Sequence, residues 1–162
     1  MGRRATAEEE INVSLETLED LNVQCYKIDR GGHATLHSPG QLVIYPVLKL
    51  SDYNLSVREY LCLLQKTTLN FMKKFGIDAF NKDESPGIFT SKGKIAFFGI
   101  RVRMGIAFHG ISINVSNQVE DFSLIRSCGI DNETFDQMKD YDVNSSLEQL
   151  FSCWVEEFKC QF

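Results

Sequence analysis

The stretch KIAFFGIRVRMGIAFHGISINV, which covers residues 94–115, predicts two long β-strands joined by a tight turn. Residues 94–102 and 106–115 are rich in β-branched and aromatic side chains, and Arg103-Met104-Gly105 between them is typical of a hairpin. In the second run, one set of side chains alternates with another: Phe108, Gly110, Ser112 and Asn114 with His109, Ile111, Ile113 and Val115. This alternation indicates a sheet with one face against the core.

One amphipathic helix is expected before this hairpin and one after it. The first covers residues 56–75, starts with a capping box at Ser56 and Glu59, and ends before Gly76. Its apolar stripe consists of Val57, Tyr60, Leu61, Leu64, Thr68, Phe71, Met72 and Phe75. The second follows a capping box at Ser145 and Glu148. Its stripe consists of Leu147, Leu150, Phe151, Trp154, Val155 and Phe158.

The remaining segments predict shorter elements. We expect a short helix at 14–20, strands at 23–28, 41–47 and 87–90, and a polar loop at 81–87. Pro46 predicts an edge or a bulge in its strand, because proline cannot donate a backbone hydrogen bond. Strands in the middle with helices covering a face predict an α+β fold. Without repeats or a linker, residues 1–162 are expected to form one domain.

Composition argues against several classes of protein. The net charge is −5 and no basic run occurs, which argues against a nucleic-acid partner. The five cysteines show no C-x-x-C spacing, so neither a zinc site nor a disulfide framework is indicated. No apolar stretch approaches the ~20 residues of a membrane span, and no signal peptide is recognisable at the start. We therefore expect a cytoplasmic protein with reduced thiols, no membrane contact and no metal.

Candidate chemistry lies in glycine-bounded turns at 30–41, 94–114 and 127–129. Glycines allow backbone to approach a ligand closely and expose N–H groups that can stabilise an oxyanion. Each reactive side chain there also has a purely structural interpretation. His37 can cap a turn, His109 can belong to a sheet, Lys94 can start a strand, and Cys128 can be an inert buried thiol.

Four motifs occur together in one order. They are Arg30-Gly31-Gly32-x-x-Thr35-x-His37-x-Pro39-Gly40-Gln41-Leu42 with Tyr45-Pro46, Lys94-Ile95-Ala96-x-x-Gly99-Ile100-Arg101-Val102, His109-Gly110-x-x-x-Asn114-Val115, and Cys128-Gly129-Ile130. With this order and spacing, the chain resembles the lipoyl(octanoyl) transferase family from Gly2 to about Ile130. The resemblance implies the biotin/lipoate ligase-like fold, a mixed β-sheet flanked by helices.

The resemblance also implies a site. Cys128 would be the acyl-carrying nucleophile, and Lys94 would lie beside it, lower the pKa of its thiol and shuttle the proton. The substrate-binding residues would be Arg30, Gly31, Gly32, His33, Ala34, Thr35, Leu36, His37, Phe97, Phe98, Gly99, Gly110, Ile111 and Ser112. Phe97, Phe98 and Ile111 would form walls for the octanoyl chain.

Some positions depart from the family's pattern. Ser38 stands where the family usually has Gly, Ser127 where it usually has Pro, and Phe97-Phe98 where smaller residues are common, which predicts a shorter pocket. Met1-Gly2-Arg3-Arg4-Ala5 resembles a turn that ordinarily follows a strand–helix–strand segment in the family. The chain is therefore expected to lack that amino-terminal segment, through a late start codon or a truncation.

The implied reaction moves an octanoyl or lipoyl group from acyl carrier protein to a lipoyl-domain lysine, without any cofactor. The acceptors would be the lipoyl domains of 2-oxoacid dehydrogenases and the glycine cleavage H protein. Because these partners are acidic, we expect a local basic patch at Arg30, Arg101 and Arg103. Two alternatives stay open: a non-catalytic remnant that binds acyl or lipoyl partners, and an ATP-dependent lipoate or biotin ligase of the same fold.

Overall fold

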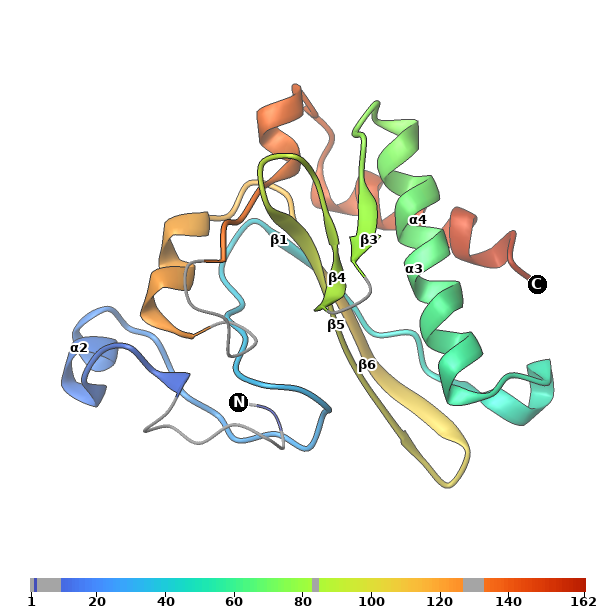
Figure 1. Cartoon of the computed structure of the whole chain (residues 1–162), viewed down its shortest axis with the longest axis horizontal. Coiled ribbons are helices and arrows are strands. Elements are labelled where there is room, and N and C mark those ends of the chain that lie inside the picture. Colours follow the sequence, from blue (N-terminus) through green and yellow to red (C-terminus); the bar gives the residue numbers. More distant parts are fainter. Residues whose placement is uncertain (1, 3–9, 83–84, 127–132) are drawn as a thin grey trace.

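A six-stranded sheet forms the centre of the computed structural model, which describes residues 2, 10–82, 85–126 and 133–162. The strand order is β1-β6-β5-β4-β3, and β2 also pairs with β6 (Figure 1). The strands are β1 (Gln41–Ile44), β2 (Leu48–Lys49), β3 (Phe80–Lys82), β4 (Ser85–Phe89), β5 (Lys94–Arg103) and β6 (Ile106–Asn114). Their ladders are antiparallel, and an isolated parallel bridge joins Lys94 to Phe135.

The predicted hairpin is confirmed as β5 and β6. Its turn is made by Met104 and Gly105, whose φ angles of 51° and 78° suit a tight connection. The interruption predicted at Pro46 is also confirmed. β1 ends at Ile44, and the chain pairs with β6 again only at Leu48.

Helix α3 (Val57–Lys74) packs on one face of the sheet and confirms the prediction for this segment. Ser56 and Glu59 form the capping box, with each side chain bonded to the other's backbone N–H. Gly76 follows the helix with a φ of 69°, a left-handed conformation that glycine adopts without strain. The buried stripe is narrower than predicted, because Val57 is 50% exposed at the first turn.

Helix α4 (Leu147–Lys159) lies on the same side of the sheet, against α3 and β1. The predicted capping box was wrong by one residue. Ser146 and Gln149 make it, because the helix begins one position later than the pattern indicated. Leu150 and Trp154 are buried, whereas Leu147 and Phe151 are exposed and lie outside the packed stripe.

The opposite face of the sheet is covered by irregular chain and short helices. These helices are α2 (Leu15–Asp20), capped by Ser14 as expected, and the 3-10 helix η2 (Val119–Leu124). Two further 3-10 helices are η1 (Leu50–Tyr53) and η4 (Met138–Tyr141). None of the helices in the described ranges is long and apolar enough to cross a membrane.

Two short-element predictions were wrong. Residues 23–28 are irregular rather than a strand, because β-prone side chains form a strand only where another strand pairs with them. The segment 81–87 is not a polar loop throughout, since β3 and β4 pair there as a short antiparallel ladder.

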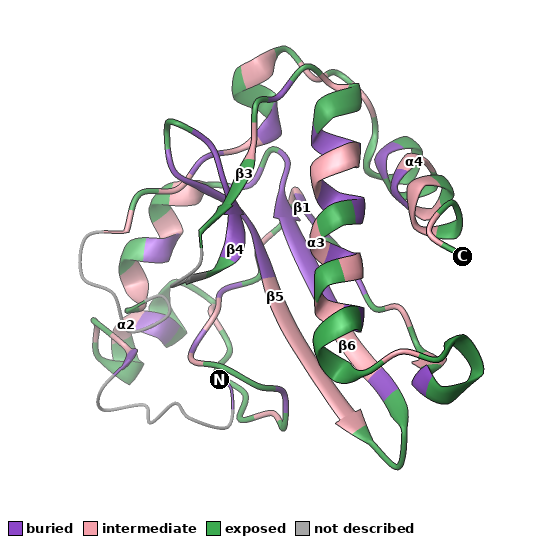
Figure 2. Ribbon diagram, turned by 45° about the vertical axis from the view of Figure 1, so that its right-hand side comes forward, coloured by how far each residue is buried: buried purple, intermediate pink, exposed green. Residues whose placement is uncertain are grey.

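Side-chain alternation along β5 divides the core into two parts. Ala96, Phe98, Ile100 and Val102 pack with α3 and α4 in what we call the helix-side core. Phe97 points to the other face and packs with Leu36 and Phe122 in the loop-side cluster. Figure 2 shows the inner part of the sheet buried, whereas the far end of the β5–β6 hairpin is intermediate to exposed.

Candidate functional site

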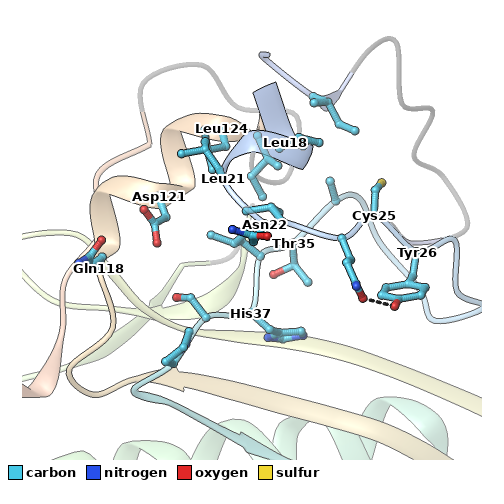
Figure 3. A pocket seen from close by; sticks show the side chains of 18 of the residues that line it. Leu18, Leu21, Asn22, Cys25, Tyr26, Thr35, His37, Gln118, Asp121 and Leu124 are labelled. Atoms are coloured by element: carbon cyan, nitrogen blue, oxygen red, sulfur yellow. Dashed lines mark hydrogen bonds between the residues drawn. The ribbon is translucent and has the colours of Figure 1, made fainter. Parts of the chain in front are cut away.

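A pocket of about 840 Å³ lies on the loop side of the sheet, between α2, η2 and the irregular segment before β1 (Figure 3). Its apolar lining includes Leu18, Leu21, Val23, Ile28, Leu36, Leu124 and Ile125. Polar side chains also line it, among them Thr35, His37, Gln118 and Asp121. This combination of apolar walls and a few polar groups suits an acyl chain with a polar end.

Five of the predicted binding residues line this pocket: Arg30, Ala34, Thr35, Leu36 and His37. The turn beside them, Gly31 to His33, borders the sheet and does not belong to the lining. Gly31 N–H donates to the carbonyl of Ile100 at 3.2 Å, which fixes the turn to β5. The predicted glycine-bounded turn therefore positions the wall of the pocket.

Arg30 lies flat on β5 and is only 7% exposed. A β-carbon added to Gly99 would lie 2.9 Å from Arg30 Cδ, so the absence of a side chain at Gly99 makes room for the arginine. Its guanidinium NH1 donates to the Gly31 carbonyl at 2.9 Å. Arg30 therefore ties the turn to the sheet from below.

Glu10 is a site residue that the sequence did not reveal. It is buried, and its carboxylate bonds to the His33 ring and accepts from the Ala34 backbone N–H. His33 is thereby held by a carboxylate at the edge of the turn. An isolated glutamate in an acidic run carries no pattern that would predict this contact.

The predicted residues on β5 and β6 divide between the two faces. The pairs Phe97–Ser112 and Gly99–Gly110 stand directly opposite each other in the β5–β6 ladder and belong to the loop-side face. Phe98 and Ile111 pack in the helix-side core instead. Because neighbouring side chains on a strand point to opposite faces, these two cannot be walls of a pocket on the loop side.

Lys94 is completely buried at the start of β5. Its Nζ lies 3.2 Å from Glu133 Oε1 and within 5.4 Å of the centres of the Phe89 and Phe97 rings. A carboxylate and two aromatic faces stabilise a positive charge in this position. Phe97 belongs to the loop-side cluster with Leu36, so the buried ammonium lies next to the wall of the pocket.

Cys128, the predicted nucleophile, lies outside the described residues. Glu133 follows it closely in the sequence, and the Lys94 contact therefore comes from the same part of the chain. Glu133 was not predicted. Ion pairs between residues 39 positions apart leave no trace in a local pattern.

His37 donates or accepts a hydrogen bond with Gln41 Oε1 at 2.6 Å, and Gln41 in turn contacts Asn114. The packing of atoms around the ring lowers the pKa of His37, and the charge of Arg30 acts in the same direction. The hydrogen bond with Gln41 opposes them. The net effect favours the neutral imidazole.

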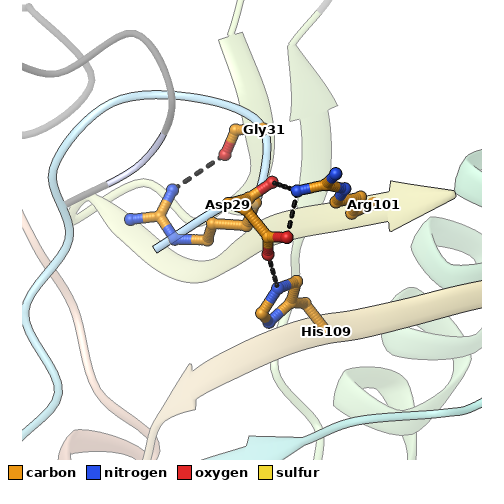
Figure 4. Close-up of polar contacts among 5 residues, drawn as sticks. Asp29, Gly31, Arg101 and His109 are labelled. Carbon is orange, nitrogen blue, oxygen red and sulfur yellow. Dashed lines mark hydrogen bonds and ion pairs between the residues drawn. The ribbon is translucent and has the colours of Figure 1, made fainter. Parts of the chain in front are cut away.

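His109 has a structural partner rather than a place in the pocket. Its Nε2 lies 3.2 Å from Asp29 Oδ1, and Arg101 also pairs with Asp29 (Figure 4). The hydrogen bond with His109 is the largest cause of the lowered pKa of Asp29, and Arg101 contributes further. The predicted basic patch was wrong in this respect, since Arg101 is neutralised by Asp29 and Arg30 is buried.

Within the described ranges, no group of three or more His, Cys, Asp or Glu side chains is placed to hold a metal ion. The chemistry of the pocket therefore rests on His37, Thr35 and the nearby Lys94.

Comparison with known families agrees with this geometry. Residues 1–159 match the family described as the lipoyl protein ligase A/B catalytic domain. The chain belongs to this family. The match covers the whole sheet, both long helices and every predicted site residue of the lipoyl protein ligase A/B fold.

Several relatives within the lipoyl protein ligase A/B family are octanoyltransferases. That of Dechloromonas aromatica strain RCB is 37% identical over 126 residues, which are 78% of this chain and 62% of the relative. That of Persephonella marina is 46% identical over 112 residues, or 69% of this chain and 54% of the relative. The chain thus spans between about half and two thirds of these relatives.

Solved structures confirm the biotin/lipoate ligase-like fold. A T. acidophilum protein described as a lipoate protein ligase, with bound lipoic acid, superposes with a TM-score of 0.79 at 19% identity, covering 98% of this chain and 66% of that one. A lipoate-protein ligase A bound with ATP gives 0.79 at 18% identity, covering 98% and 66%. An Aquifex aeolicus biotin protein ligase gives 0.59 at 11% identity, covering 98% and 68%.

Proposed function

We propose that the chain transfers an octanoyl group from acyl carrier protein to a lysine of a lipoyl domain through a thioester on Cys128. The observation that carries the proposal is the buried Lys94 ammonium beside the apolar pocket. It supplies a fixed positive charge where the family resemblance requires a thiolate. The octanoyltransferase relatives support the same activity.

The first step loads the enzyme. The Cys128 thiolate attacks the carbonyl carbon of the octanoyl thioester, and the thiol of acyl carrier protein leaves. A cysteine is mostly protonated near neutral pH, and a neighbouring ammonium such as Lys94 favours its charged form. The apolar lining of the pocket takes up the eight-carbon chain, since each buried CH₂ contributes about 0.8 kcal/mol.

The binding residues of the proposal follow the loop-side face. Arg30 and Gly31 to His33 hold the turn, while Ala34 to His37 line the pocket. Phe97, Gly99, Gly110 and Ser112 supply the floor from β5 and β6. No cofactor takes part, the acceptors would be lipoyl domains of 2-oxoacid dehydrogenases and the glycine cleavage H protein, and the reaction would take place in the cytoplasm.

Intact mass spectrometry tests the proposal. Incubation with octanoyl-acyl carrier protein, without ATP, should add one octanoyl group that hydroxylamine removes. Cys128→Ser should lose the hydroxylamine-sensitive adduct, whereas Cys62→Ser, which changes an exposed thiol on α3, should keep it. An adduct mapped to Cys25, Cys62, Cys153 or Cys160 contradicts the assignment. A requirement for ATP and free acid would instead indicate a ligase.

A further inference from the structure

A continuous path of hydrogen bonds joins the pocket to the far side of the sheet end. His37 Nδ1 lies 2.6 Å from Gln41 Oε1, and Gln41 Nε2 donates to Asn114 Oδ1 at 2.9 Å. Asn114 Nδ2 donates to the backbone carbonyl of Asp136 at 3.0 Å. Gln41 and Asn114 are buried, so water does not compete for these bonds.

The direction of every bond in this path follows from its last member. The Asp136 carbonyl can only accept, so the amide nitrogen of Asn114 must face it. Asn114 Oδ1 then faces the other way, where it accepts from Gln41 and also from Asn117 Nδ2 at 3.2 Å. Gln41 consequently directs its own oxygen toward His37. Turning either amide over would place two oxygens or two N–H groups against each other.

The path therefore determines the tautomer of His37. The imidazole nitrogen that faces Gln41 Oε1 must donate, so Nδ1 carries the hydrogen. In the neutral ring the other nitrogen, Nε2, keeps its lone pair. His37 lines the pocket and is solvent-accessible, so that a ligand can reach the ring. The lowered pKa of His37 is consistent with a neutral ring.

We propose that His37 Nε2 accepts the proton of the amine that attacks the octanoyl thioester, and that Gln41 and Asn114 are the positioning residues that hold it ready. The inference rests on the proposed function. Lys94 is less suited to this step, because it is buried and already holds a positive charge against Glu133. A neutral, accessible imidazole is the commonest general base in enzymes.

The step is balanced as follows. The amine nitrogen attacks the thioester carbonyl carbon and forms the C–N bond, while its proton passes to His37 Nε2. The C–S bond breaks, and sulfur leaves as the Cys128 thiolate, which Lys94 stabilises. The resulting imidazolium returns its proton to water.

A tautomer measurement tests the hydrogen-bond path without any substrate. The chain has 3 histidines, and His37→Gln assigns the His37 signals in a ¹⁵N imidazole spectrum. At neutral pH we expect a protonated Nδ1 and an unprotonated Nε2. Gln41→Met should release this preference, whereas the matched change Gln65→Met, on α3, should leave it unchanged. A protonated Nε2 in the unaltered chain overturns the inference.

A comparison of two nucleophiles tests the proton transfer. In His37→Gln, octanoyl loading from acyl carrier protein should stay within about twofold of the unaltered rate. Transfer to a lipoyl-domain lysine should fall by about 10²–10⁴-fold, the usual contribution of a general base. Release by hydroxylamine should stay normal, because hydroxylamine is already a neutral nucleophile at this pH and needs no base.

Two outcomes overturn the role of His37: unchanged transfer to lysine in His37→Gln, or equal slowing with lysine and with hydroxylamine, which would indicate a damaged pocket. Failure of the proposed function looks different. In that case the unaltered chain forms no acyl-enzyme at all, and the tautomer measurement decides the inference by itself.

Discussion

The side chain of Lys94 lies directly over Gly87: a β-carbon built on Gly87 would lie 2.5 Å from Lys94 Cε. The glycine on β4 thus leaves the space through which the buried lysine reaches Glu133. The end of a lysine side chain can shift more easily than backbone, so a methyl group here should displace the ammonium and leave the sheet formed.

We therefore expect Gly87→Ala to slow octanoyl loading at least about tenfold, which corresponds to about 1.4 kcal/mol of lost stabilisation. The far-ultraviolet circular dichroism spectrum should be unchanged, because β4 and β5 keep their pairing. A Gly87→Ala protein that loads octanoate at the unaltered rate would show that the position of the ammonium is unimportant.

Removing Lys94 should lower the reactivity of Cys128. Iodoacetamide labelling of this cysteine near neutral pH should slow in Lys94→Met, because the neighbouring ammonium no longer favours the thiolate. Lys92→Met is the matched control, since Lys92 is exposed two residues earlier and contacts Tyr141 instead. Equal labelling rates in both variants would separate Lys94 from Cys128.

Stability needs its own control in this experiment. Lys94→Met leaves the Glu133 carboxylate buried without its ammonium, and breaking one partner of a buried pair costs about 3–5 kcal/mol. Lys94→Met combined with Glu133→Gln should recover much of that loss in urea unfolding. The double variant should still label slowly, which distinguishes lost reactivity from lost structure.

Thr35 carries a buried hydroxyl that faces the pocket wall. Its Oγ1 has no hydrogen-bond partner among the described residues, and an unpaired buried hydroxyl costs about 1–3 kcal/mol. We expect Thr35→Val to raise the free energy of unfolding of the ligand-free protein. If a bound acyl group or its carrier pairs with this hydroxyl, the same change weakens binding. Lower stability together with unchanged binding would contradict this assignment.

Tyr60 predicts alkaline instability. Burial raises the pKa of Tyr60 from 10.0 to about 12, and its hydroxyl donates to the Pro46 carbonyl at 3.2 Å. The unfolded chain ionises first, so the stabilisation is complete below about pH 10 and is lost as pH rises through 12. Tyr60→Phe should abolish this loss, worth roughly 3 kcal/mol, in urea unfolding at pH 8 and 11. Parallel pH profiles of the two proteins would refute it.

The elements predicted well from sequence are those whose signals are local and unambiguous. The β5–β6 hairpin shows period-two alternation around Gly105, and α3 begins at one clear capping pair, Ser56 and Glu59. The start of α4 was ambiguous. Ser145 and Ser146 precede Glu148 and Gln149 at the same spacing, so pattern alone cannot choose between them.

The parts of the site that escaped prediction depend on distant partners. Glu10 and Glu133 are buried by their contacts with His33 and Lys94, which lie 23 and 39 positions away. Facing was missed at Phe98, because a motif identifies residues near a site but not the side of the strand they occupy.

The sheet gives its two faces unequal support. On the helix side, β5 and β6 pack against α3 and α4, whereas on the loop side the pocket is roofed by irregular chain and the small loop-side cluster. Amide protons of 21–40 should therefore exchange with solvent through partial opening, long before those of β6. The pocket thus has a stable floor and a separately melting roof, so an acyl chain can enter from the side by transient loss of local order. Once bound, the same chain would slow the exchange of the roof that admitted it.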